Sequence, residues 1–592
     1  MGVAVSYTHC HCWAGTRFPH YPPQISMTVK AIIRKLDAAR RQPTSQGDIK
    51  RILGLPKFNL RAPDLTNKYR LAGGKFSLFP IQSQALYEAY IAGGLFGMVS
   101  VGNGKTLISD LLPRIYGSQR PLLLLPPQMV EQYHEMHEEF SQHFLVADNM
   151  QVLSYSKLSV ASGAYTLKTY QPDLIIADEA HYLRHRSSTR TKRVARFMAE
   201  NPDTRFCALS GTLTNRSLRD YAHIMEWCLG NNSPIPFDFL MQESWSACLD
   251  ANGQPNKLDW GKAATFFHQI AGHRVPLDQE NFRKVFRYRL TTTPGVVASR
   301  QGSVGASLII HQRSTPIPDS VSMALAKLAS TWTTPDGMEI ADALSYHRVS
   351  RQLSKGFYTV WDWGERGPDY AYINARSTWN AQVRRYLSKN REGQDSMLLI
   401  SNALSQGRIT HSSDPELYDA WAVWQQYKSR GEPPTKPVWL DTFLVEDALA
   451  WAYETVKSTK EPLIIWYESL GVQAMLEQAN IPTYGSGSAR PEPDPKQPII
   501  ACSIRVHGTG KNLQKWSNQL LLSPPSSGAV FEQLLGRMHR TGQQADEVHM
   551  TVYQHTEAFR SALATARRDA RYIQDTQGTK QKLLYATYTD QP

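Results

Sequence analysis

Two adjacent carboxylates end an apolar run in residues 173–181, which read Asp-Leu-Ile-Ile-Ala-Asp-Glu-Ala-His. The run 174–177 has no polar face, so it predicts a buried strand. Asp178 and Glu179 then stand at the carboxyl end of that strand, where open α/β sheets bind their ligands. A nucleotide-hydrolysing site needs one carboxylate near magnesium and another that orients the attacking water. These residues therefore indicate phosphoryl-transfer chemistry.

A glycine-rich segment upstream has the composition of a loop that holds phosphates, and it reads Gly102-Asn103-Gly104-Lys105-Thr106. Glycines let backbone N–H groups approach phosphate oxygens closely. Lys105 would reach the β- and γ-phosphates, and the Thr106 hydroxyl would ligate magnesium. The full pattern has a glycine where this chain has Val99, so the loop gains its weight from the downstream acidic pair. The structural alternative is a glycine-rich turn beside a buried acidic cap.

Gln82 precedes this segment in a predicted helix. Its side-chain amide offers one donor and one acceptor, which suit the edge of an adenine base. The alternative is a surface glutamine on a helix.

The elements that must position these residues alternate between strand and helix from about residue 76 to residue 214. Predicted strands at 121–125, 151–155, 174–177 and 205–210 indicate a parallel sheet with helical crossovers. A basic run follows the acidic motif, and it either grips a phosphodiester backbone or forms a solvated helix face. Its members are Arg184, Arg186, Arg190, Lys192, Arg193 and Arg196.

The chain changes in texture after residue 216. Strand signals thin out between 217 and 440, apart from one predicted strand at 307–314, and Trp and Tyr are scattered through helical patterns. We expect aromatic residues such as Trp361 and Trp363 to serve as core more often than as platforms for bases. Strands then resume and predict a second parallel α/β domain. These strands lie at 462–467, 498–503, 519–523 and 548–553.

The second α/β segment has no phosphate loop of its own, but it carries Arg537 and Arg540 in residues 533–543. Arginines three positions apart share one face of a helix. Two guanidiniums on one face can meet a triphosphate that another domain holds. The alternative is a pair of surface arginines on a solvated helix.

Composition limits the classes of protein that fit. The 592 residues, 41% of them hydrophobic and 10% aromatic, allow large cores. No stretch approaches eighteen consecutive apolar residues, so we expect no membrane span. A net charge of +13 and a pI near 9.3 fit a polyanionic partner such as nucleic acid. Six cysteines do not suggest a disulfide scaffold, so we expect a reducing compartment.

The ordered set of motifs resembles the superfamily-two helicases and, within them, the Swi/Snf-like DNA translocases of phage or bacterial type. Residues 508–514 (Gly-Thr-Gly-Lys-Asn-Leu-Gln) and 536–543 (Gly-Arg-Met-His-Arg-Thr-Gly-Gln) carry the subgroup resemblance. The resemblance covers 76–216 and 441–556. It implies an α/β fold of two RecA-like parallel-sheet domains with a large helical insertion between them. The expected division is an N-terminal tail and helical segment (1–75), a first RecA-like ATPase domain (76–216), a helical insertion (217–440) and a second RecA-like domain with a C-terminal basic helix (441–592).

By this resemblance the site would bind ATP and Mg²⁺. Asp178 and Thr106 would hold the magnesium, and Glu179 would activate the attacking water. The remaining roles are adenine contact by Gln82, nucleotide binding by Gly102, Asn103, Gly104, Lys105, Thr106 and Gly510, coupling to nucleic acid by His181, Ser210, Gly211 and Thr212, and completion of the site from the second domain by Gln533, Arg537 and Arg540.

The expected activity is ATP hydrolysis that drives movement along duplex or forked DNA, for remodelling, repair, replication or recombination. Two alternatives stay open: a strand-separating helicase that acts on DNA or RNA, and the motor subunit of a restriction or defence complex. The expected location is the cytoplasm of a bacterial or phage-infected cell, or the nucleus if the source is a eukaryote.

Overall fold

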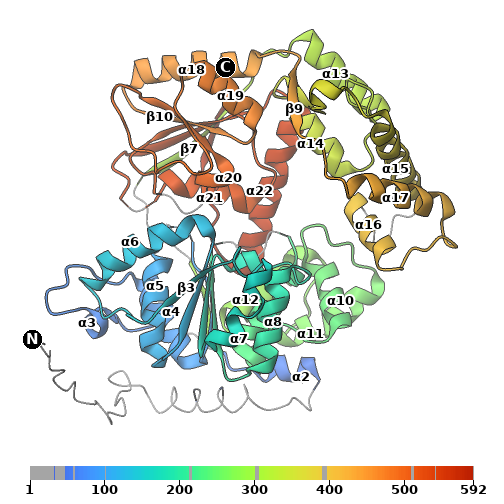
Figure 1. Cartoon of the computed structure of the whole chain (residues 1–592). Helices are drawn as coiled ribbons and strands as arrows, with labels where there is room; N and C mark the ends of the chain where they lie inside the picture. The colour runs from blue at the N-terminus through green and yellow to red at the C-terminus, as the bar shows by residue number, and fades with distance from the viewer. Residues whose placement is uncertain are drawn as a thin grey trace, which may run out of the picture.

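The chain builds two parallel β-sheets, one above the other in Figure 1, with a group of helices beside them. This computed structural model describes Ile33, Leu36 and residues 47–57, 61–100, 102–211, 216–299, 306–389, 396–508, 512–540 and 542–590. The fold is α/β, as the alternation of strand and helix signals predicts. Within the described residues, no helix combines the length and apolar character that a bilayer crossing requires.

The first lobe is the six-stranded sheet with the helices packed on it. Its strand order is β3-β2-β4-β5-β1-β6, and every neighbouring pair is parallel. The strands are β1 (Leu95–Met98), β2 (Pro121–Leu125), β3 (Gln151–Ser154), β4 (Leu174–Asp178), β5 (Arg205–Ser210) and β6 (Val296–Ala298).

Both faces of the first sheet are covered, which explains why its strands are apolar runs rather than alternating ones. In β4, Leu174 and Ile176 point to one face, and Ile175 and Ala177 point to the other. The first of these faces packs against α4 (Pro80–Ala92), α5 (Lys105–Tyr116) and α6 (Val130–Ser141). The second packs against α7 (Thr166–Tyr170), α8 (Thr189–Glu200), α9 (Ala222–Leu229), α10 (Phe239–Leu249), α11 (Lys257–Ala271) and α12 (Gln279–Thr291).

The second lobe is the seven-stranded sheet with its helices. Its order is β11-β12-β10-β13-β14-β7-β15, again with parallel neighbours throughout. The strands are β7 (Ser307–Arg313), β10 (Leu463–Tyr467), β11 (Thr483–Tyr484), β12 (Ile499–Ser503), β13 (Asn518–Leu521), β14 (Glu547–Tyr553) and β15 (Thr587–Asp590). One face packs against α18 (Phe443–Thr459) and α19 (Leu470–Gln478), and the other against α20 (Ile504–His507), α21 (Gly528–Met538), α22 (Glu557–Gln577) and α23 (Lys582–Tyr585).

The predicted division of the chain at 216/217 and 440/441 does not match the sheets. Strand β6 is an edge strand of the first sheet, and α9 to α12 complete the core on one of its faces. Strand β7 belongs to the second sheet. In the predicted helical region 217–440, the described elements between residues 319 and 439 belong neither to the two sheets nor to the helices that cover the first sheet. The apolar periodicity of α9 to α12 shows that they are helices, but it cannot show which sheet they cover.

Residues 319–439, the middle segment, have hydrophobic clusters of their own. Trp361 and Trp363 contact the ring of Tyr372 edge-on, with centroids 5.1 and 5.5 Å apart. Both tryptophans are therefore partly buried against the cluster that contains Tyr372, in line with a packing role. The elements are α13 (Asp319–Thr331), α14 (Ala343–Leu353), β8 (Phe357–Trp361), α15 (Tyr370–Lys389), α16 (Met397–Ser405), α17 (Pro415–Lys428) and β9 (Thr435–Trp439), and β8 pairs antiparallel with β9.

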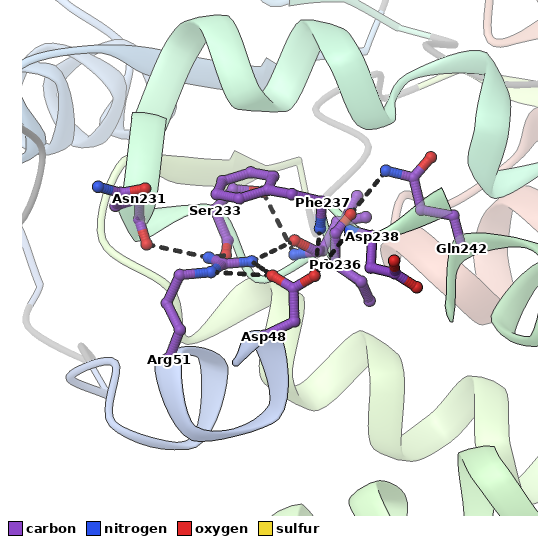
Figure 2. A network of polar contacts seen from close by, with 9 residues as sticks. Asp48, Arg51, Asn231, Ser233, Pro236, Phe237, Asp238 and Gln242 are labelled. Carbon is purple, nitrogen blue, oxygen red and sulfur yellow. Dashed lines mark hydrogen bonds and ion pairs between the residues drawn. The ribbon is translucent and has the colours of Figure 1, made fainter. Parts of the chain in front are cut away.

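The short helix α2 (Asp48–Leu53) is fastened to the first lobe by a buried polar network (Figure 2). The Arg51 guanidinium donates to three backbone carbonyls and pairs with Asp48 at 2.8 Å. Asp48 in turn accepts from the backbone N–H groups of Phe237 and Asp238. The part of the expected N-terminal segment that forms α2 is therefore docked on the first lobe. The carbonyl acceptors belong to Asn231, Ser233 and Ile235.

Helix α22 connects the two lobes. In Figure 1 it is the long red helix that runs from the upper lobe down to the lower one. It packs along α21 in its own lobe and along α12 of the first lobe. Arg287 of α12 donates to the carbonyl oxygen of Gln574 at 3.2 Å, and the Arg283 guanidinium lies 5.3 Å from the ring centre of Tyr572.

Candidate functional site

The glycine-rich segment forms the turn between β1 and α5. Gly102 and Gly104 have φ angles of 92° and 67°, in the left-handed region that favours glycine. A Cβ at Gly104 would overlap the side-chain amide of Gln82. The turn delivers the chain into the first residue of α5, Lys105. Because the first N–H groups of a helix have no partner within it, this end of α5 can bind an anion.

Lys105 points from α5 to the acidic pair at the end of β4. Its Nζ lies 3.3 Å from Oε1 of Glu179 and donates to the carbonyl oxygen of Val99 at 3.4 Å. Both charged side chains are largely buried, with 10% and 8% of their surfaces exposed. The loop and the acidic motif, predicted from separate stretches of sequence, therefore meet in one site.

Asp178 and Glu179 are directed differently by the backbone. Asp178 is the last residue of β4, and its carbonyl oxygen accepts from the Tyr155 hydroxyl at 2.8 Å. Glu179 has a φ of 51°, which is uncommon for a residue with a long side chain. Its own N–H donates to Oδ1 of Asp178 at 2.9 Å. This turn aims the two carboxylates at different neighbours.

The environment shifts the pKa values of the two carboxylates in opposite directions. Burial and the adjacent charge of Glu179 raise the pKa of Asp178 above its usual value. Burial also acts to raise the pKa of Glu179, but the Lys105 ammonium, His181 and Ser210 outweigh it and hold that pKa below its usual value. Neighbouring carboxylates with opposite shifts are typical of sites where one group accepts a proton.

Two of the predicted coupling residues touch Glu179. The Ser210 hydroxyl donates to Oε2 of Glu179 at 3.0 Å. Nδ1 of His181 lies 3.1 Å from that hydroxyl and 3.3 Å from the same carboxylate oxygen. Gly211 follows Ser210 and is buried, and Thr212 lies outside the described residues.

Gln82 lies at the loop, but its amide is engaged by the backbone. Its Oε1 accepts from the N–H of Phe79 at 2.7 Å, and its Nε2 donates to the carbonyl oxygen of Gly104 at 3.1 Å. Gln82 thus links the start of α4 to the loop. The expected contact with adenine remains a prediction that needs this amide to turn.

The second lobe presents Arg537 toward the same site. The guanidinium is buried, and its Nε donates to the carbonyl oxygen of Gln533 on α21 at 3.0 Å. Burial and the nearby Arg540 lower the pKa of Arg537 to about 9, while the charge of Glu179 acts in the opposite direction. Arg537 and Glu179 therefore interact electrostatically across the boundary between the lobes.

Arg540 lies near Arg537 in the second lobe. It donates to Oδ1 of Asn512, and burial and Arg490 lower its pKa to about 10. Gln533 is buried on α21. Gly510 lies outside the described residues.

Ser299 is a member of the site that sequence reasoning missed. Its hydroxyl accepts from the N–H of Ser100 at 3.1 Å and from the side-chain amide of Asn103 at 3.3 Å. Ser299 follows β6, the neighbour of β1, so the sheet brings it to the loop. It is far from the loop in sequence and forms no recognisable motif with it, so no local signal indicates it.

The basic run 184–196 divides between structural and exposed residues. Arg190 donates to the carbonyl oxygen of Tyr182, Arg193 to those of Leu158 and Val160, and Arg186 to His223. Lys192 and Arg196 are exposed on α8. At least half of the run therefore holds the first lobe together, and the remainder is a weaker candidate for a grip on phosphates.

The donor set around the loop suits a magnesium ion. Magnesium prefers oxygen ligands and takes one or two from a protein alongside substrate phosphates and water. The Thr106 hydroxyl on α5 and the Asp178 carboxylate on β4 are oxygens of that kind, and α5 packs beside β4.

A scan against protein-family models finds no family that matches the chain, and a search of curated proteins likewise finds no match.

Proposed function

We propose that this protein is an ATP hydrolase whose two sheets are RecA-like domains that close on one ATP molecule and couple its hydrolysis to movement on DNA. The observation that carries the proposal is the buried ion pair of Lys105 and Glu179, with 3.3 Å between Nζ and Oε1, which joins the glycine-rich loop to the acidic end of β4. Buried charged groups are costly unless they serve a ligand or each other. A triphosphate in this position would receive a cation from each lobe.

The residues of the chain divide the work of phosphoryl transfer. The loop glycines and the start of α5 bind the phosphates, and Lys105 neutralises their terminal charge. Glu179 orients and deprotonates the attacking water. Arg537, with Arg540 and Gln533, stabilises the charge that develops in the transition state. Thr106 and Asp178 would hold a magnesium ion, which would neutralise charge on the phosphate oxygens.

Nucleic acid is the proposed partner because of the charge of the chain. A net charge of +13 and a pI near 9.3 favour a polyanion. Movement follows if the two lobes grip the DNA backbone alternately as nucleotide binding and hydrolysis change their separation. In this proposal the middle segment, residues 319–439, is an insertion carried on the second lobe.

The test is ATP hydrolysis by the purified full chain at low salt, with and without duplex DNA. We expect DNA to stimulate hydrolysis, and we expect Lys105→Ala, Glu179→Gln and Arg537→Ala each to lower kcat by about a hundredfold or more. The matched control is Lys262→Ala, which removes an exposed lysine of the first lobe outside the basic run. An absence of DNA-dependent hydrolysis in the parent chain would refute the proposal.

The same assay with other ligands separates the alternatives. Single-stranded, forked and RNA ligands show which nucleic acid stimulates best. A tailed duplex then shows whether the strands separate. Stimulation by RNA alone would replace a DNA motor with an RNA helicase.

A further inference from the structure

Arg216 makes the one side-chain ion pair between the lobes that we find among the described residues. Its Nε and Nη2 donate to the two carboxylate oxygens of Asp569 on α22, at 2.8 and 3.2 Å. Nη2 also donates to the carbonyl oxygen of Ser526 at 3.3 Å. A bidentate pair of a guanidinium and a carboxylate has a fixed geometry, so it sets an orientation as well as a distance.

Arg216 belongs firmly to the first lobe. Its carbonyl oxygen accepts from the N–H of Ala251 at 3.0 Å. The next two residues are held by Asp250, which accepts from the Ser217 hydroxyl at 2.6 Å and from the N–H of Leu218 at 2.8 Å. Only the side chain of Arg216 reaches the second lobe, so any movement of one lobe relative to the other must distort or break this ion pair.

On the other side, Asp569 touches the start of the helix that carries Arg537. Its Oδ2 also accepts from the N–H of Gly528, the first residue of α21, at 3.3 Å. A Cβ at Gly528 would come within 2.6 Å of the carbonyl oxygen of Ala566, so α21 begins in close contact with the backbone of α22. Asp569 therefore connects Arg216 to the base of α21.

The first-lobe end of this connection leads back to Glu179. Arg216 stands five positions after Gly211 and six after Ser210, whose hydroxyl donates to Glu179. In sequence, the pair therefore joins the segment that follows β5 to the first residue of α21.

We propose that Arg216 and Asp569 are positioning residues that fix α21 against the first lobe, so that Arg537 stands opposite Glu179 when the site closes. This inference rests on the proposed function, because it gives the pair a role in ATP hydrolysis. Neither residue touches the reacting atoms, and both act through the orientation of α21.

Burial gives the pair a direction. Asp569 is only 2% exposed, whereas Arg216 is 42% exposed. Burial raises the pKa of Asp569, and Arg216 and the N–H of Gly528 oppose that rise. Separation of the lobes would take the bidentate partner from the carboxylate and leave it the Gly528 N–H and the charge of Arg568, since Arg216 moves with the first lobe. Opening is therefore disfavoured at this point, and the closed arrangement is favoured.

The experiment compares Arg216→Gln, Arg216→Lys and the double variant Arg216→Gln/Asp569→Asn with the parent chain. We expect Arg216→Gln to lower kcat for ATP hydrolysis roughly tenfold or more, because small misplacements of catalytic groups cost rate steeply. KM for ATP should stay within about twofold, since the first-lobe loop binds the phosphates. Arg216→Lys should retain part of kcat, and the double variant should be no slower than Arg216→Gln.

A second readout does not depend on catalysis. Spin labels at Lys192→Cys on α8 and Lys457→Cys on α18, in a background with Cys10 and Cys12 replaced by Ser, report the distance between the lobes. We expect one narrow distance distribution in the parent and a broader, longer one in Arg216→Gln. The control is Lys284→Gln, which breaks an exposed ion pair with Glu280 inside the first lobe.

The two readouts keep the two proposals apart. An inactive parent chain whose distance distribution still broadens in Arg216→Gln would remove the proposed function but keep the connection between the lobes. An active parent whose kcat and distance distribution are both unchanged by Arg216→Gln would overturn the inference. Equal loss of kcat in Arg216→Gln and Lys284→Gln would overturn it too, because the effect would then be one of lost surface charge.

Discussion

A comparison of alanine substitutions at Gly104 and Gly117 tests how closely Gln82 packs against the glycine-rich loop. They lie at the two ends of α5, and both have left-handed backbones, with φ angles of 67° and 61°. A Cβ at Gly104 would overlap the amide nitrogen of Gln82, whereas a Cβ at Gly117 would meet nothing within 4 Å. Alanine at either position tests the same backbone penalty, and only Gly104→Ala adds a collision.

The expected difference follows from these contacts. An L-residue in the left-handed region costs about 1 to 2 kcal/mol, and we expect Gly117→Ala to destabilise α5 by that amount. Gly104→Ala also displaces Gln82 and breaks its 3.1 Å hydrogen bond to the Gly104 carbonyl oxygen. Loss of a buried hydrogen bond adds about 1 to 2 kcal/mol, so we expect a total of about 2 to 4 kcal/mol.

The assay is native-state hydrogen exchange of the amides in α5, which reports the free energy of opening of that helix. Gln82→Ala/Gly104→Ala completes the test: without the amide, the penalty at Gly104 should fall to that of Gly117→Ala. Equal destabilisation by Gly104→Ala and Gly117→Ala would contradict the reasoning, because Gln82 would then not press on the loop. A lower affinity for ATP should accompany Gly104→Ala alone.

Two further predictions concern buried cations and protons. We expect Arg51→Met to destabilise the first lobe by about 3 to 5 kcal/mol, since it strands Asp48 and three carbonyl oxygens; urea unfolding checks this, with the exposed Lys50→Met as the control. Burial lowers the pKa of His555 to about 4 from an unfolded value near 6.5, so the unfolded chain binds more protons in that window and stability should fall as the pH drops from about 6.5 to 4. Gln in place of His555 cannot bind this proton, so the urea midpoint of His555→Gln should depend less steeply on pH. An unchanged slope would contradict the assignment of this pH dependence to His555.

Local patterns predict most of the strands that carry the site. The apolar runs at 121–125, 174–177 and 205–210 become β2, β4 and β5, and their burial on both faces explains why runs without alternation are strands. The meeting of Lys105 with Glu179 is also predictable, because the carboxyl ends of parallel strands share one edge of a sheet. Chemistry at strand ends is thus visible before the fold is known.

Long-range partners are not predictable in the same way. Ser299 reaches Asn103 only because β6 pairs with β1, and Arg216 reaches Asp569 only because α22 spans both lobes. Each contact depends on the order of strands or the docking of a helix rather than on a motif. The predicted region 217–440 departs from the observed sheets for the same reason: β6 lies in a stretch for which no strand is predicted, and the predicted strand at 307–314, which is β7, does not show which sheet it joins.

The pairing of Lys105 with Glu179 has a consequence for the order of events under the proposed function. Glu179 stays charged because the Lys105 ammonium, together with His181 and Ser210, outweighs the effect of burial. A phosphate that draws Lys105 away would remove the main counter-charge, so the pKa of Glu179 would rise and the carboxylate would become a stronger base. The base would therefore be activated by the binding of its substrate. Arg537, which already interacts with Glu179, would limit that rise once the lobes close. Lobe closure and the basicity of Glu179 therefore oppose each other. We expect ATP hydrolysis to be fastest where these two effects are balanced.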